Sequence, residues 1–140
     1  MTNDYFYVIT PVRSDPDFDK KNRVLREVGA GYKCVPFFPF EHIKPYSIDC
    51  ALEHLRTAQF VLADLSHERP SCYFELGLAQ AVGTPVIIIA ENGTSIHQIG
   101  DTARVLWYSC IEEYRETVNK ILAQFAKTYI CGDTSTRRKN

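Results

Sequence analysis

Two carboxylates separated by a short polar loop are the residues of this chain best placed for chemistry. The apolar run 60–63 ends in Asp64, and after the loop a helix is expected that carries Glu75 in its first turns. In open α/β proteins, ligands bind at the carboxyl ends of the parallel strands. Two acids at one such cleft indicate chemistry on a polar bond.

Basic and hydroxyl side chains near these acids are candidates for holding an anionic ligand. Arg13 follows the first apolar run, where a guanidinium can grip a phosphate or a carboxylate. Ser71 and the backbone N–H groups at the start of the expected helix suit a phosphate. Arg69, in the loop before Glu75, is a further candidate for a phosphate contact, and His67 in the same loop is a candidate proton donor.

Strand-like and helix-like segments alternate along the chain. Strands are predicted at 5–10, 32–38, 60–65, 85–90 and 105–108. Helices are predicted at 14–27, ended by Gly29 and Gly31, at 48–58, capped by Ser47, and at 73–82 and 111–127. The stretch from Pro39 to Pro45 is predicted to be a proline-rich loop.

This alternation predicts one α/β domain with a parallel sheet and right-handed crossovers. Five strands in a chain of 140 residues favour a flavodoxin-like three-layer sandwich of strand order 2-1-3-4-5. The switch point then lies between strands one and three, which makes Arg13, Asp64 and Glu75 neighbours. The domain is predicted to span residues 1–131, with a disordered polar tail at 132–140.

Composition excludes several classes of protein. A net charge of -1 gives no electrostatic reason to bind nucleic-acid polymers or anionic membranes. Apolar runs are too short for a membrane helix and the N-terminus lacks the basic region of a signal peptide, so a cytoplasmic protein is expected. The five cysteines are widely spaced and suggest neither a metal site nor disulfides. Cys72 is expected to have a lowered pKa near a helix N-terminus.

Several segments resemble the nucleoside 2-deoxyribosyltransferase-like superfamily, over about residues 5–108. The specific part is Val61-Leu-Ala-Asp64-Leu-Ser66 followed by Tyr73-Phe-Glu75-Leu-Gly77-Leu-Ala79 and Gly83-Thr-Pro85-Val-Ile-Ile; Tyr7-Val-Ile-Thr-Pro11 is supportive. This superfamily includes deoxyribosyltransferases and nucleotide N-glycosidases, and its fold is related to TIR-type NAD-cleaving domains.

The resemblance implies cleavage of an N-glycosidic bond of a nucleoside or nucleotide, without a metal or redox cofactor. Glu75 matches the catalytic glutamate, and Asp64 matches an acid that positions the sugar or its attacking group. The segment from Pro11 to Ser14 matches the region around base and sugar. The residues expected to contact substrate are Tyr7, Pro11, Arg13, Ser14, Asp49, Ser66, His67 and Ser71.

Two departures and two alternatives accompany this hypothesis. The nearest counterpart of a sugar-contacting aspartate, Asp49, is about two residues out of register, and 11–15 replaces a glycine-rich first loop. The alternatives are a TIR-like module that cleaves NAD or makes a nucleotide signal, and a nucleotide-sensing domain without turnover. Related folds often build the site between subunits, so a homodimer or larger homo-oligomer is also implied.

Overall fold

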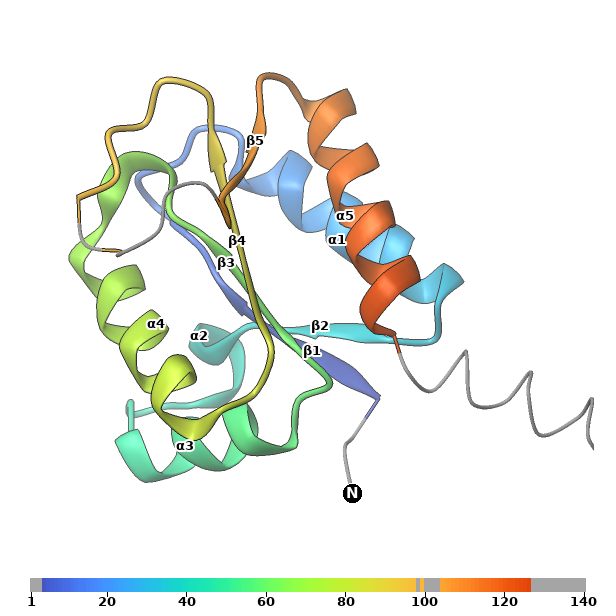
Figure 1. Ribbon diagram of the computed structural model, residues 1–140. Helices are drawn as coiled ribbons and strands as arrows, with labels where there is room; N and C mark the ends of the chain where they lie inside the picture. The colour runs from blue at the N-terminus through green and yellow to red at the C-terminus, as the bar shows by residue number, and fades with distance from the viewer. Residues whose placement is uncertain (1–3, 98, 100–103, 127–140) are drawn as a thin grey trace, which may run out of the picture.

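In the computed structural model, which describes residues 4–97, 99 and 104–126, one parallel sheet lies between two layers of helices (Figure 1). The strands are β1 (Tyr5–Ile9), β2 (Val35–Phe37), β3 (Val61–Asp64), β4 (Val86–Glu91) and β5 (Leu106–Tyr108). The helices are α1 (Phe18–Gly31), α2 (Pro39–His42), α3 (Ile48–Thr57), α4 (Pro70–Val82) and α5 (Ile111–Phe125), with a 3-10 helix η1 (Ser66–Glu68).

The strand order is β2-β1-β3-β4-β5, which confirms the predicted fold class and topology. All four strand pairs are parallel, and β1 pairs with β2 on one side and with β3 on the other. The carboxyl ends of β1 and β3 therefore lie together at the switch point, where the loops that follow them flank one crevice.

Alternation along β1 and β3 sends successive side chains to opposite faces of the sheet. Tyr5, Tyr7 and Ile9 pack in a core with α3 and α4, whereas Phe6 and Val8 pack in a core with α1 and α5. In β3, Val61 and Ala63 belong to the α4 face, and Leu62 belongs to the α1 face. Figure 1 shows the two helical layers on either side of the sheet.

Some predicted boundaries are wrong for identifiable reasons. Helix α1 runs from Phe18 to Gly31 instead of over 14–27, so both glycines lie within it, and a Cβ on Gly29 would collide with the Cys34 carbonyl oxygen. Gly29 therefore serves the close approach of α1 to the chain before β2. Helix α4 begins at Pro70 rather than Tyr73, since proline is favoured in the first helical turn. The predicted loop from Pro39 to Pro45 contains α2.

Other expectations depend on regions outside the described residues. The tail 132–140, Lys127 at the predicted end of the last helix, and Cys131 all lie there.

Ser47 caps α3 as predicted, because its Oγ accepts a hydrogen bond from the Cys50 N–H at 3.3 Å. None of the described helices is long and apolar enough to cross a membrane.

Candidate active site

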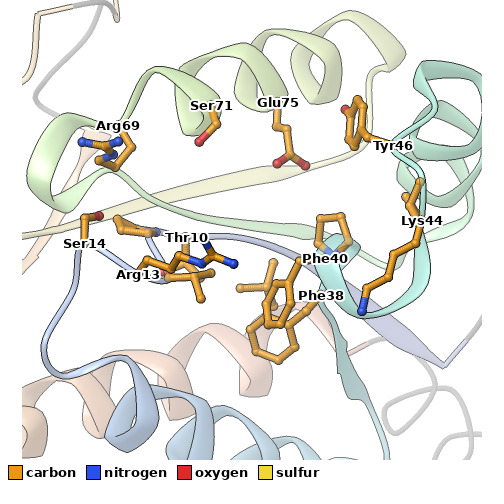
Figure 2. A pocket seen from close by; sticks show the side chains of 15 residues that line it. Thr10, Arg13, Ser14, Phe38, Phe40, Lys44, Tyr46, Arg69, Ser71 and Glu75 are labelled. Carbon is orange, nitrogen blue, oxygen red and sulfur yellow. The ribbon is translucent and has the colours of Figure 1, made fainter.

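A pocket of about 840 Å³ opens at the carboxyl edge of the sheet beside Glu75. The loop after β1, the segment around α2 and the start of α4 form its wall (Figure 2). Its lining residues are Val8, Thr10, Pro11, Val12, Arg13, Ser14, Phe38, Pro39, Phe40, Ile43, Lys44, Tyr46, Arg69, Ser71 and Glu75. A volume of this size is ordinary for a site that binds a small ligand.

Glu75 is held at the pocket by a tyrosine from the central strand. The hydroxyl of Tyr7 donates a hydrogen bond to Glu75 Oε2 at 2.8 Å, and Tyr7 itself is fully buried. Burial raises the pKa of Glu75, and the Tyr7 hydrogen bond opposes this by stabilising the carboxylate. Burial and the Glu75 carboxylate also raise the pKa of Tyr7, which therefore stays a donor. Tyr7 thus orients the carboxylate and favours its ionised form.

Tyr7→Phe is expected to raise the pKa of Glu75 further, because it removes the bond that lowers it. The measurement is a titration of the Glu75 side-chain carboxyl by carbon NMR in both proteins. Tyr5→Phe is the matched control, since the Tyr5 hydroxyl donates to the His54 carbonyl and not to Glu75. An unchanged Glu75 titration in Tyr7→Phe would show that this hydrogen bond does not stabilise the carboxylate.

Three basic side chains line the pocket without an ion pair of their own. Arg13, Lys44 and Arg69 pair with no described acid, whereas Lys21, Arg26 and Arg115 do. Glu75 is the single acid among the lining residues, so three cations against one carboxylate leave a formal excess of two positive charges. The pocket therefore favours an anionic ligand.

The polar and aromatic lining residues are unevenly distributed around Glu75. In the view of Figure 2, Ser14, Arg69 and Ser71 lie to one side of Glu75, and Tyr46 and Lys44 lie to the other. Phe38 and Phe40 lie across from Glu75 in this view, between Arg13 and Lys44. Burial and the Glu75 carboxylate both raise the pKa of Tyr46, so its hydroxyl stays protonated near the acid.

The Ser71 end of the pocket also offers backbone donors. Ser71 is the second residue of α4, and its N–H has no backbone acceptor in the described part of the chain. An N–H group of this kind, beside a guanidinium and two hydroxyl groups, is suited to phosphate oxygens.

Asp64 does not line this pocket. Its side chain is directed to the α1 face of the sheet, where Oδ2 accepts a 2.6 Å hydrogen bond from the Tyr108 hydroxyl. Its Oδ1 accepts from the Ser66 N–H at 2.9 Å, which is an Asx turn. Asp64 is 1% exposed, and burial raises its pKa against the opposing effect of Lys21. Asp64 therefore lies outside the pocket that Arg13 and Glu75 line.

The remaining predicted contacts divide between the pocket and other places. Pro11, Arg13, Ser14, Ser71 and Glu75 line the pocket, and Tyr7 reaches it through Glu75.

Three predicted contacts lie elsewhere. Ser66 is fully buried, and its Oγ lies 3.1 Å from the Tyr108 hydroxyl and accepts a hydrogen bond from the Glu91 N–H at 2.8 Å. His67 does not line the pocket and lies near the carboxylates of Asp15 and Glu91, and Asp49 is exposed in the first turn of α3.

The expected lowered pKa of Cys72 is wrong. Cys72 is 3% exposed, and its burial raises the pKa of the thiol to about 12 despite its place near the start of α4.

Lys44, Tyr46 and Phe40 were not predicted as pocket residues. They come from the segment around α2, whose proline-rich sequence predicts a loop but not the direction of its side chains.

Comparisons with known proteins agree with the fold. No protein-family model and no curated protein matches the chain. Among solved structures, the 2-deoxyribosyltransferase of Bacillus psychrosaccharolyticus is similar over 81% of this chain and 95% of its own, at 16% identity and a TM-score of 0.59. The CMP N-glycosidase of Clostridium botulinum is similar over 82% of this chain and 98% of its own, at 13% identity and a TM-score of 0.61.

A third solved structure has the same architecture. The deoxyribosyltransferase of Leishmania mexicana is similar over 83% of this chain and 97% of its own, at 18% identity and a TM-score of 0.57. These identities are low, so the likeness establishes a shared fold over nearly the whole of each compared chain.

Proposed function

We propose that this protein cleaves the N-glycosidic bond of a nucleoside or nucleotide, with Glu75 as the nucleophile or as the carboxylate that stabilises the sugar cation. The observation that carries the proposal is a partly buried carboxylate, fixed by Tyr7, at a pocket with aromatic and cationic sides. The structures similar to this chain belong to enzymes named for such chemistry, which supports the proposal.

The proposed reaction proceeds at the anomeric carbon of the sugar. The bond between this carbon and the base nitrogen breaks, its electron pair leaves with the base, and the base takes up a proton. Positive charge develops on the anomeric carbon and ring oxygen, and ionised Glu75 stabilises it or bonds to the carbon. Water or a second base then attacks the same carbon, frees Glu75 and loses a proton, which balances the proton taken up by the leaving base. Attack by water makes the protein a hydrolase, and attack by a second base makes it a transferase.

A phosphorylated substrate is favoured over a free nucleoside. Arg13, Arg69, Ser14 and Ser71 provide two cations and two hydroxyl groups for the phosphate. Phe40 and Tyr46 provide aromatic surface for the base. Glu75 would then lie between the phosphate and the base, at the bond that breaks. In this proposal Asp64 does not contact the sugar.

The homo-oligomer implied by the sequence resemblance stays a proposal. Exposed apolar side chains near the pocket are compatible with it, namely Phe40, Tyr46, Ile48 and Phe74.

Release of free base from a substrate panel tests the function. The panel holds ribo- and deoxynucleosides, their mono- to triphosphates and NAD, with and without an added second base to detect transfer. We expect base release from a nucleotide in preference to its nucleoside. Release of nicotinamide from NAD alone would favour the TIR-like alternative. Tight binding without release or transfer of any base would favour a sensing domain and contradict the proposal.

A further inference from the structure

A buried lysine joins four segments on the α1 face of the sheet. Lys21 is 3% exposed, and its Nζ donates to Asp15 Oδ2 at 2.6 Å and to Glu91 Oε1 at 2.8 Å. Asp64 Oδ2 lies 3.9 Å from the same nitrogen. The three acids come from the loop after β1 and from the carboxyl ends of β3 and β4. The ring of Tyr108, in β5, lies 5.0 Å from Nζ.

Charge in this cluster is unbalanced. One ammonium group faces three carboxylate side chains, those of Asp15, Asp64 and Glu91. Burial lowers the pKa of Lys21, but its neighbouring acids raise it more, so the lysine is charged. Asp15, His67 and Glu91 bring ligand atoms within 4.8 Å of one another, yet Lys21 already binds two of these residues. The cation of this cluster is therefore the lysine.

The cluster borders both segments that supply polar side chains to the pocket. Asp15 directly follows Ser14 and is two residues from Arg13. His67, whose Nε2 lies 3.8 Å from Asp15 Oδ1 and 3.9 Å from Glu91 Oε1, is two residues from Arg69. Lys21 and Asp15 do not line the pocket themselves.

We propose that Lys21 is a positioning residue for the pocket: through Asp15 it holds the loop of Arg13 and Ser14 against the ends of β3 and β4. This inference rests on the proposed function for the identity of the ligand. A buried ammonium with several acceptors fixes geometry because each carboxylate would otherwise be buried without a counter-charge. Loss of Lys21 then releases the loop, and the ligand has to order it on binding.

The experiment compares Lys21→Met with Lys20→Met in the full chain. Lys20 is the control, since its side chain is 67% exposed and its pair with Asp17 spans 3.8 Å at the surface. Two quantities are measured: hydrogen exchange of residues 12–15 without ligand, and the Kd and KM for the nucleotide that the wild type prefers. We expect faster exchange in this loop and a KM at least about tenfold higher, with kcat within about threefold.

A second, milder variant tests the same contact if Lys21→Met does not fold. Asp15→Asn keeps the shape and the acceptor for the Asp17 N–H but loses the charge that faces Lys21. We expect the same direction of change, and a smaller effect than that of Lys21→Met. Folded variants with unchanged loop exchange, or with faster exchange but an unchanged Kd, would overturn the proposal.

Failure of the proposed function has a different signature. A wild type that binds no member of the panel would contradict the nucleotide substrate and, with it, the positioning role at this pocket. In that case the exchange comparison alone decides whether Lys21 holds the loop.

Discussion

Glu75→Gln is expected to remove base release while making the protein more stable. Glutamine is close in shape and still accepts the Tyr7 hydrogen bond, but it cannot carry the negative charge that the sugar cation requires. Loss of one group that stabilises charge in a transition state costs about 10²–10³ in kcat, and loss of a nucleophile costs at least as much. Base release is measured by chromatography on the preferred substrate.

The expected gain in stability follows from the raised pKa of Glu75. Burial makes the folded protein hold the Glu75 proton more tightly than the unfolded chain does. Ionisation therefore destabilises the fold as pH rises from the ordinary carboxyl value through the raised one, and the cost persists above it. Glutamine removes this cost, so the variant is more stable near neutral pH and the difference vanishes below about pH 4. Urea unfolding at both pH values measures it.

Glu68→Gln is the control for this prediction. The hydrogen bond with His97 lowers the pKa of Glu68, so its ionised form is favoured in the fold and glutamine brings no gain. Glu68 does not line the pocket and its variant should keep activity. A Glu75→Gln protein that still releases base at the wild-type rate would remove Glu75 from the reaction.

Asp64→Ala is expected to lower the free energy of unfolding by about 2–4 kcal/mol, because each buried donor left without its acceptor costs about 1–3 kcal/mol. The change leaves the Ser66 N–H and the Tyr108 hydroxyl without their acceptor, while Lys21 keeps its hydrogen bonds to Asp15 and Glu91. Such a loss is a large share of the total stability of a domain. Denaturant unfolding measures it, with Asp49→Ala as the exposed-acid control, expected within about 0.5 kcal/mol of wild type.

Asp64→Asn separates the structural role from the sugar-positioning role implied by the resemblance. It retains an oxygen for the Ser66 N–H, so a folded variant is expected. Because Asp64 is closed off from the pocket, its kcat should stay within about tenfold of wild type, well short of the loss expected for a catalytic group. A hundredfold loss in folded Asp64→Asn would restore the role that the resemblance implies.

The period-2 alternation of strands explains both the success and the failure of the sequence analysis at these acids. The position of Glu75 in the first turns of the helix after the loop correctly predicted its place at the pocket, where Tyr7 donates a hydrogen bond to it. In β3, Ala63 faces α4 and the next residue, Asp64, must face α1. The same alternation places Phe6 on the opposite face of β1 from Tyr5 and Tyr7. Applied to β3 together with the strand order, it would have separated Asp64 from Glu75.

Two other features of the site have weak or incomplete signals in the sequence. Lys44 and Tyr46 reach the pocket from an irregular segment, and such a segment has no period from which side-chain direction follows. Lys21 falls at helical spacing with Val24 and Leu25, on the buried face of α1. A lysine within an apolar stripe was a usable signal for a buried charge, but its three acidic partners come from distant segments and required the strand order.

The place of β1 in the sheet has a consequence for synthesis of the chain. This strand is buried along its whole length, and its pairing partner β3 lies far downstream, with Tyr7 opposite Val61. In a nascent chain, α1 and β2 can cover one face and one edge of β1, but the edge that pairs with β3 stays unpaired until β3 leaves the ribosome, because non-local pairs form only after the intervening chain is available. The centre of the sheet and the Tyr7–Glu75 contact are consequently completed late, so fragments released early in translation hold neither.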